Sequence, residues 1–273
     1  MEFSYLNASQ TRTEKIDKSN FYMHTHDFYE IYCFLEGEAN YSVEGVIYPL
    51  EPGDVILLRK GEAHYLLPDE SFPYERIAVH FDFKNIDDDY ISKRLLSVFN
   101  DRPLGKFNRY PAEIFTDMKP LYYLKKICDS TNDSQKIISI LALLEELYEK
   151  FEFVKQDPFE HLTDNSSDIL RYINRHLTDD LSLKNLCKHF FVSKSQLNRN
   201  FKKANGSTIW EYITVKRLLL AKEMLKNGGR PTKIYLECGF NDYVTFFKAY
   251  KKPCFLGFGA VYSGFYASCK CGR

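Results

Sequence analysis

The stretch from Ser182 to Lys252 most constrains the fold of this chain, because it contains one two-helix pattern twice, about 48 residues apart. In the first copy, Ser193 can begin a helix by accepting a hydrogen bond from a backbone N–H group. Leu197 and Phe201 lie four residues apart on that helix and are predicted to face inward. The residues left for the outer face are donors and cations: Lys194, Ser195, Gln196, Asn198, Arg199 and Lys202. Such a face suits DNA phosphates and base edges.

The second copy follows the same plan. A helix is predicted to end at Gly239, a residue type that tolerates the left-handed C-terminal turn. Asn241 is the expected cap of the next helix, which is predicted over residues 242–252 with Phe246 facing inward. Its outer face is expected to carry Tyr243, Val244, Phe247 and Lys248. This helix is therefore a second candidate for DNA recognition.

One long helix is predicted between the two copies, over residues 207–226, because apolar residues recur there at helical spacing. A helix of roughly 19 residues is about 28 Å long. Successive turns of the DNA major groove are about 34 Å apart. One chain can therefore place two helices in adjacent grooves on one side of DNA.

The segments SLKNLC, SKSQLNRNFKKANGSTIWEYI, KRLLLAKEML, IYLEC and GFNDYVTFFKAYKK together resemble the DNA-binding domain of AraC/XylS-type transcription regulators. The resemblance covers residues 166–252 without a gap. It implies a bipartite helix-turn-helix domain that binds promoter DNA, with RNA polymerase as a further expected partner. Carried over by position, it places base contacts on Ser195, Asn198, Arg199, Tyr243, Val244 and Lys248.

Charged residues are unevenly divided along the chain. From Asn165 onward there are 19 Lys+Arg against 7 Asp+Glu, whereas the first 164 residues hold 18 against 30, so the formal net charge is zero. A basic C-terminal part beside an acidic N-terminal part is expected where a DNA-binding module is joined to a second module. The 22 Phe and 20 Tyr supply ample core material and exclude a wholly disordered chain.

Seven cysteines are scattered through the chain, and no Cys-x-x-Cys pair occurs. This usage argues against a disulfide framework and favours a reducing compartment. The N-terminus has no signal pattern, and no apolar run is long enough to cross a membrane. We therefore expect a soluble, cytoplasmic protein with no membrane partner.

Residues 21–83 contain short apolar runs separated by Gly and Pro turns. Runs such as residues 31–35 and 55–58 predict strands, and Glu44-Gly45 predicts a hairpin turn between two of them. The polar residues 1–20 are expected to form a short arm. Many short strands with such turns predict an N-terminal β-barrel, so the expected fold is α+β multidomain: a β-barrel followed by an all-α bipartite helix-turn-helix domain.

Two segments of the predicted barrel, from His24 to Gly37 and from Gly53 to His64, resemble the two cupin motifs. Arg59 stands where the second motif usually has proline. The resemblance implies a cupin-like, double-stranded β-helix. In a strand, His24 and His26 point to the same face. With Glu30 and His64 they form one possible three-His, one-carboxylate metal set.

A metal-free ligand pocket is the alternative that we favour for this motif, because the resemblance to AraC-type sensors implies it. Its polar groups would hydrogen-bond a small polar effector, such as a sugar. We therefore predict no cofactor and no metal. The predicted ligand-binding residues are His24, His26, Glu30, Tyr32, Arg59 and His64.

A helix is predicted over residues 135–151, with apolar residues at coiled-coil-like spacing. The spacing leaves two alternatives open: the helix packs on its own barrel, or it pairs with the same helix of a second chain. The family resemblance implies the second, so a homodimer is expected. The predicted division is a cupin-like sensor domain over 1–100, a helical dimerisation segment and linker over 101–165, and an AraC-type DNA-binding domain over 166–273.

The resemblance stops after Lys252, where the chain continues PCFLGFGAVYSGFYASCKCGR. We expect a ligand-responsive transcription regulator of the AraC type and not an enzyme, and the sequence leaves open whether it activates or represses. One alternative is a metal-dependent cupin enzyme with an appended nucleic-acid-binding domain. A second is a regulator that fails to bind DNA because its atypical tail, from residue 253, replaces a helix of the second unit.

Overall fold

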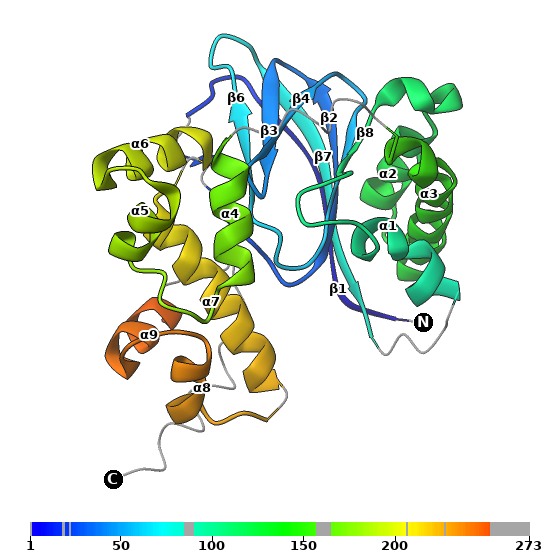
Figure 1. The fold of residues 1–273 in the computed structure, drawn as a ribbon. Helices are drawn as coiled ribbons and strands as arrows, with labels where there is room; N and C mark the ends of the chain where they lie inside the picture. Colours follow the sequence, from blue (N-terminus) through cyan, green and yellow to red (C-terminus); the bar gives the residue numbers. More distant parts are fainter. Residues whose placement is uncertain are drawn as a thin grey trace.

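The computed structural model describes residues 2–17, 20–21, 23–84, 90–156, 165–205, 207–226 and 228–251. A β-rich domain with its own helices occupies one side of the molecule, and an all-helical domain occupies the other (Figure 1). The strands are β1 (Phe3–Thr13), β2 (Tyr29–Glu36), β3 (Ala39–Val43), β4 (Val46–Leu50), β5 (Val55–Leu58), β6 (His64–Pro68), β7 (Tyr74–Phe83) and β8 (Arg109–Tyr110). The described α-helices are α1 (Ser97–Asn100), α2 (Lys119–Asp129) and α3 (Asp133–Val154), then α4 (Asn165–Arg175), α5 (Leu183–Phe190), α6 (Lys194–Asn205), α7 (Ile209–Lys226), α8 (Pro231–Glu237) and α9 (Tyr243–Tyr250).

The strands form two sheets. The five-stranded sheet has the order β1-β7-β2-β5-β8, and the three-stranded sheet has the order β4-β3-β6. The predicted hairpin is confirmed: Val43 pairs with Val46 across Glu44 and Gly45, whose φ angles are 49° and 81°. Two positive φ angles are typical of the type I′ turn, whose twist matches that of the flanking strands.

A hydrophobic core joins the two sheets face to face. Side chains alternate across a strand, so Tyr32 and Phe34 of β2 point to one face, and Ile31 and Cys33 point to the other. The first pair packs against side chains of the three-stranded sheet, including Tyr41 on β3. Since both faces of β2 are covered, its first six residues are all buried.

Helices α1, α2 and α3 cover the outer face of the five-stranded sheet (Figure 1). Buried side chains of α3, among them Leu143, Leu144 and Leu147, join the same core as Ile31 and Cys33. The first of the two alternatives for this helix is therefore observed: it packs on its own sheet. The fold prediction is confirmed, since a cupin-like β-domain precedes an all-α region.

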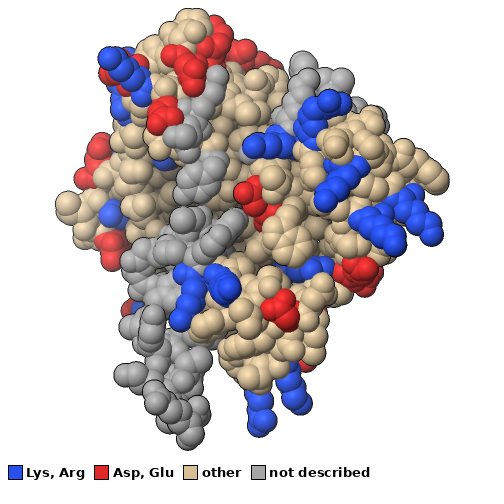
Figure 2. Space-filling view, turned by 90° about the vertical axis from the view of Figure 1, so that its left-hand side faces the viewer, with Lys and Arg blue, Asp and Glu red and all other residues tan. Residues whose placement is uncertain are grey.

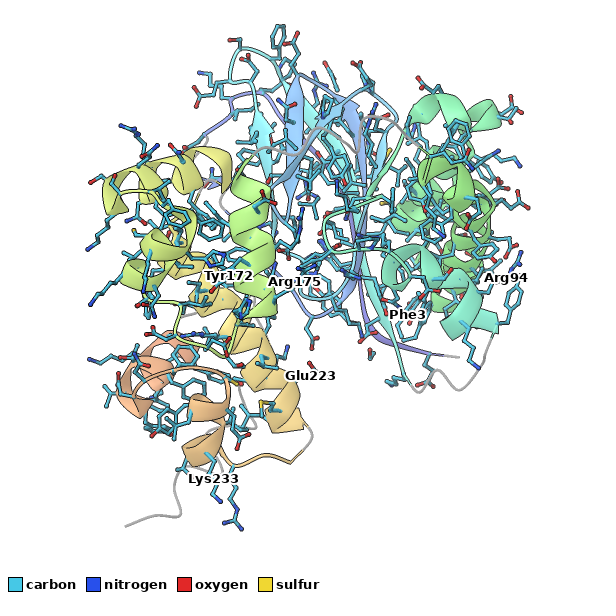
Figure 3. All side chains as sticks on the ribbon, in the orientation of Figure 1. Phe3, Arg94, Tyr172, Arg175, Glu223 and Lys233 are labelled. Atoms are coloured by element: carbon cyan, nitrogen blue, oxygen red, sulfur yellow. The ribbon has the colours of Figure 1, made fainter. Side chains whose placement is uncertain are left out.

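The prediction of an N-terminal arm over residues 1–20 is wrong for its first part. Phe3–Thr13 forms β1, an edge strand that pairs antiparallel with β7. Phe3 stacks on Phe83 with ring centroids 5.2 Å apart, at the N-terminal end of the strand (Figure 3). The strand was not predicted because its sequence is mostly polar. An edge strand with one side facing solvent needs few apolar residues.

The helical domain contains two helix-turn-helix units joined by α7. α5 and α6 form the first unit, and α8 and α9 form the second. Gly239 has a φ of 85° after α8, as expected for a left-handed turn at the helix end, and Phe240 is buried behind that turn. α7 has 18 residues and is therefore about 27 Å long. Among the described residues, no helix is both long enough and apolar enough to span a membrane.

Candidate functional site

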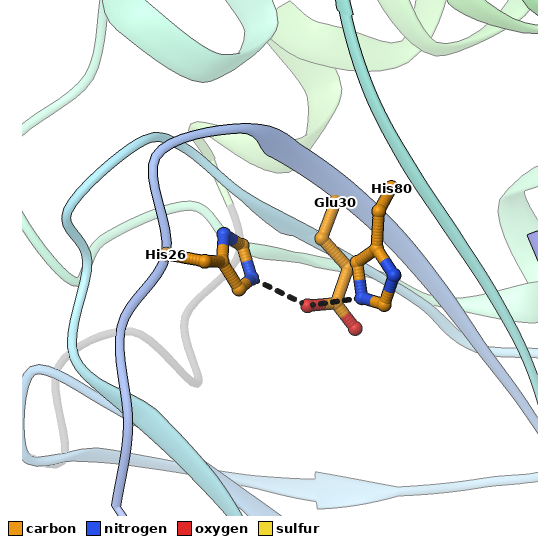
Figure 4. A group of neighbouring side chains, drawn as sticks. All are labelled: His26, Glu30 and His80. Atoms are coloured by element: carbon orange, nitrogen blue, oxygen red, sulfur yellow. Dashed lines mark hydrogen bonds and ion pairs between the residues drawn. The ribbon is translucent and has the colours of Figure 1, made fainter. Parts of the chain in front are cut away.

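Histidines of the β-domain gather around the carboxylate of Glu30 (Figure 4). Its Oε2 atom lies 2.8 Å from His26 Nε2, 3.3 Å from His80 Nε2 and 3.5 Å from His64 Nε2. Glu30, His26 and His64 are buried, and the side chain of His80 is 20% exposed. The cluster thus places one anionic group against three imidazoles in the interior of the domain.

Strand register explains why these residues meet. Glu30 on β2 lies directly opposite His80 on β7 in the antiparallel ladder. Alternation directs both side chains to the face that carries Tyr32, which is the face toward the three-stranded sheet. His64 begins β6 in that second sheet, and His26 lies in the segment that precedes β2. Three strands and one connecting segment therefore supply the cluster.

Backbone carbonyls hold the other ring nitrogens of two histidines. His26 Nδ1 lies 2.9 Å from the Phe28 carbonyl oxygen, and His64 Nδ1 lies 2.8 Å from the Glu62 carbonyl oxygen. A carbonyl only accepts, so in both rings Nδ1 carries the proton. Burial lowers the pKa of His26 to about 4, which makes this ring neutral at pH 7.

The Glu30 carboxylate stays charged despite its position. Burial alone would raise its pKa. Its interactions with His80 and His26 outweigh burial and hold the pKa of Glu30 well below its ordinary value. The cluster therefore holds an ionised carboxylate inside an apolar domain.

His24 lies beside the cluster rather than in it. Its ring centroid is 4.3 Å from that of His64, and the two residues also form an isolated β-bridge. Within the part of the chain that the structure describes, His26, Glu30 and His80 form a group whose ligand atoms all lie within 4.8 Å of one another. Sequence reasoning missed His80, although the alternation of side chains along β7 was a signal that could have found it.

Tyrosine hydroxyls occupy the same interior, further along the strands. The hydroxyls of Tyr32 and Tyr74 lie 2.8 Å apart, and the Tyr32 ring is 4.7 Å from that of Tyr41. Burial raises the pKa of Tyr74 to about 12, so its hydroxyl is protonated at neutral pH. The guanidinium of Arg76 lies 6.0 Å from the Tyr32 ring centroid. These groups can donate to and accept from a polar ligand.

Arg59 points away from the histidines. Its Nη1 donates to the Arg102 carbonyl oxygen at 3.0 Å, and its Nε lies 3.5 Å from Glu62. Of the six residues predicted to bind ligand, the structure brings together His26, Glu30 and His64, places His24 and Tyr32 alongside, and directs Arg59 elsewhere.

The outer face of α6 presents polar side chains to solvent. Leu197 and Phe201 are buried, as predicted, and they fix the rotation of the helix. Asn198 is half-buried, and the side chains of Lys194, Ser195, Gln196 and Arg199 are exposed. In a view onto the helical domain, several Lys and Arg side chains lie along the right of the molecule, and others lie below its centre and at its lower edge (Figure 2).

The outer face of α9 is more apolar than that of α6. Val244 is 57% exposed and Lys248 is exposed, whereas Tyr243 is half-buried and stacks on Phe247 with ring centroids 5.7 Å apart. The cap of this helix is Asp242, whose carboxylate accepts from Thr245 N at 2.8 Å. The prediction of Asn241 as the cap is therefore wrong by one residue. Residues 252–273, including the atypical tail, lie outside the described residues.

We expect Ser193→Ala to lower the free energy of unfolding of the helical domain by about 1 kcal/mol, the usual value of an N-cap. Ser193 Oγ accepts from Gln196 N at 3.2 Å, which confirms the predicted cap of α6. Urea unfolding followed by fluorescence of the single tryptophan, Trp210 on α7, measures the change. Ser195→Ala, an exposed change in the same helix, is the control, and an equal loss in both variants would contradict the capping role.

A polar seam joins the two domains. The carboxylate of Glu44, in the β3–β4 turn, accepts from Lys216 Nζ at 2.8 Å, from Asn174 Nδ2 at 3.3 Å and from the hydroxyl of Tyr212. A pocket of about 450 Å³ lies along the same seam, between α7 and the β-domain. Glu223, on the side of α7 that faces the β-domain, is among its lining residues (Figure 3).

Two family models match the chain. The AraC-like ligand binding domain matches residues 7–116, and a helix-turn-helix domain matches residues 186–254. Together they include most of the β-domain and both candidate recognition helices.

Similar proteins come from several bacteria. The uncharacterized HTH-type transcriptional regulator YbfI of Bacillus subtilis is 25% identical and covers 80% of this chain and 78% of its own. The Msm operon regulatory protein of Streptococcus mutans is 24% identical, with 90% and 88% covered. The lactose operon transcription activator of Staphylococcus xylosus is 23% identical, with 81% and 79% covered. Among solved structures, ToxT from Vibrio cholerae aligns with a TM-score of 0.41 at 15% identity, over 90% of this chain and 93% of that one.

A ligand-binding β-domain joined to a bipartite helix-turn-helix domain defines a ligand-responsive, DNA-binding transcription regulator. Within that class, the chain belongs to the AraC family.

Proposed function

We propose that this regulator binds promoter DNA through α6 and α9. The observation that carries the proposal is the row of exposed donors on α6, held outward by the buried pair Leu197 and Phe201. The proposed DNA contacts are Lys194, Ser195, Gln196, Asn198, Arg199, Tyr243, Val244 and Lys248. α7 supports this reading because its length is close to the spacing of successive major grooves.

We expect Arg199→Ala to weaken binding to DNA from the region upstream of its own gene by roughly 10- to 100-fold, because one good bidentate base contact is worth about 1–3 kcal/mol. Fluorescence anisotropy of the full-length protein over a salt series measures the affinity. Binding by the native protein should weaken steeply with salt, since cations that neutralise phosphates release counterions.

The matched control for this experiment is Lys125→Ala, which removes an exposed cation of α2 on the β-domain. It should leave the affinity unchanged. Equal binding by Arg199→Ala and the native protein would remove Arg199 from the proposed contacts. Complete failure of the native protein to bind would favour the alternative of a regulator made defective by its tail.

We propose a carbohydrate as the effector. The lactose operon activator of Staphylococcus xylosus supports this class. The interior hydroxyls of Tyr32 and Tyr74 also suit a polyhydroxylated ligand. A panel of mono- and disaccharides should contain one that raises the unfolding temperature of the protein, because a ligand at 100 times its Kd stabilises by about 2.7 kcal/mol. The regulatory names of the relatives favour a sensing β-domain over a catalytic one.

The same proposal has four further parts. They are a division of the chain at residues 100 and 165, a homodimer, a contact with RNA polymerase and a location in the cytoplasm. α3 turns Ile138 and Phe153 to solvent, with 66% and 59% exposed, so this helix retains apolar surface for a second chain. Sedimentation analysis tests the dimer. We propose the cytoplasm because chromosomal DNA lies there in the bacteria from which the relatives come.

A further inference from the structure

The nitrogens around Glu30 form a compact set of possible ligand atoms. His26, Glu30 and His80 each offer one ligand atom, and these atoms all lie within 4.8 Å of one another. In His26, Nδ1 lies 2.9 Å from the Phe28 carbonyl oxygen, so Nε2 is the ring nitrogen that faces Glu30, at 2.8 Å. A buried carboxylate oxygen surrounded by imidazole nitrogens is a donor set that suits a first-row metal ion.

His64 supplies a second, independent observation. Its side chain is 0% exposed, and its Nε2 atom has no hydrogen-bond partner among the described residues. A buried polar atom without a partner costs about 1–3 kcal/mol. This atom lies 3.5 Å from Glu30 Oε2, beyond a good hydrogen bond but near the carboxylate that the other two imidazoles contact.

The spacing of these atoms matches a coordination shell. Ligand atoms bound at about 2.0–2.1 Å around a tetrahedral zinc ion lie about 3.3 Å from one another. The three distances from Glu30 Oε2 to imidazole nitrogens are 2.8, 3.3 and 3.5 Å. The carbonyl bonds to the Nδ1 atoms are also the usual partners of metal-bound histidines, because they orient the ring and leave Nε2 free to bind.

We propose that His26, Glu30 and His80, with His64 as the fourth ligand, bind a divalent transition-metal ion inside the β-domain. Imidazole nitrogens with one carboxylate select a first-row ion such as Zn²⁺. This set differs from the possible set that the sequence motif offers, since His80 replaces His24, and it departs from the sequence-based expectation of a metal-free pocket. The ion would link β2, β6 and β7 to the segment before β2. The inference rests on the β-domain alone and does not depend on DNA binding.

Zinc content of the full-length protein tests the proposal. The protein is stripped with a chelator, incubated with Zn²⁺, desalted and analysed by elemental mass spectrometry. We expect about one zinc per chain in the native protein and a loss of most of it in His80→Asn and Glu30→Gln. Zn²⁺ should also raise the unfolding temperature of the native protein but not of these variants.

Two control variants make the result specific. His24→Asn tests the motif residue that the geometry leaves out, and His176→Asn removes a histidine of the helical domain. Both should retain zinc. If His80→Asn retains zinc and His24→Asn loses it, the ion is bound by the set His24, His26, Glu30 and His64, and our proposed set is wrong. A native protein that holds no zinc would overturn the site as a whole. Circular dichroism confirms folding, and His80→Asn, at a partly exposed position, keeps the test valid if Glu30→Gln fails to fold.

Discussion

Arg102→Ala should lower the free energy of unfolding of the β-domain by about 3–5 kcal/mol, because it leaves a buried carboxylate without its partner. The side chains of Arg102 and Glu62 are both 0% exposed and form two parallel bonds of 2.8 and 2.7 Å. The guanidinium also donates to the carbonyl oxygens of Leu57 and Val98, both at 3.1 Å. Removing it therefore breaks a network that ties the β5–β6 connection to the segment after α1.

Urea unfolding followed by circular dichroism measures this loss, with Arg94→Ala as the control. Arg94 pairs with Glu145 on the surface, where solvent screens the charges, so its removal should change the curve little. Arg102→Lys should recover only part of the stability, because an ammonium keeps the charge but not the planar fork of donors. Equal unfolding curves for the native protein and Arg102→Ala would contradict the structural role of the pair.

The same pair predicts a pH dependence. Burial alone would raise the pKa of Glu62, but the charge and hydrogen bonds of Arg102 outweigh burial and lower it below the ordinary value of 4.5. A lowered pKa contributes stability above 4.5 that is lost as the pH falls through the folded-state pKa. The difference between the native protein and Arg102→Ala should therefore be largest at neutral pH and shrink in acid.

Local patterns in the sequence predicted the elements that depend on neighbours along the chain. The four-residue spacing of Leu197 and Phe201 gave the rotation of α6, because that spacing determines a helix face. Glu44-Gly45 gave the β3–β4 hairpin, since the type I′ turn requires residues that accept positive φ. The fold class followed from these local signals and from the family resemblance.

Features that depend on partners distant in the sequence were missed. The β1 strand exists because β7 pairs with it, about 70 residues further along the chain, and its own composition is polar. Alternation along β7 gives the face on which His80 lies, but its place in the cluster depends on the pairing of β7 with β2, which puts His80 opposite Glu30. Charged residues such as Arg102 and Glu62 usually lie at the protein surface. Only the tertiary packing pairs these two in the interior of the β-domain. The pairing of strands distant in the sequence and the burial of an ion pair could therefore not be predicted from the sequence alone.

One loop at the seam between the domains contacts both α7 and the segment that carries His26. Gly61 N donates to the His26 carbonyl oxygen at 2.9 Å, and the Gly61 carbonyl oxygen accepts from Lys216 Nζ at 2.9 Å. Asp27, the residue after His26, forms an ion pair with Lys222 at 3.0 Å. These contacts connect the segment that carries His26 to the helix that joins the two helix-turn-helix units.

We expect Glu44→Ala to weaken the contact between the domains by about 3–5 kcal/mol, since it leaves the ammonium of Lys216 and the hydroxyl of Tyr212 without their shared acceptor. Trp210 fluorescence follows the helical domain, and circular dichroism at strand wavelengths follows the β-domain. The fluorescence transition should move to a lower urea concentration and separate from the other, because a domain that loses its neighbour unfolds more independently. Glu38→Ala, at an exposed position before β3, should move neither transition. Coincident transitions in Glu44→Ala would mean that the apolar contacts alone hold the domains together and that Glu44 does not couple them.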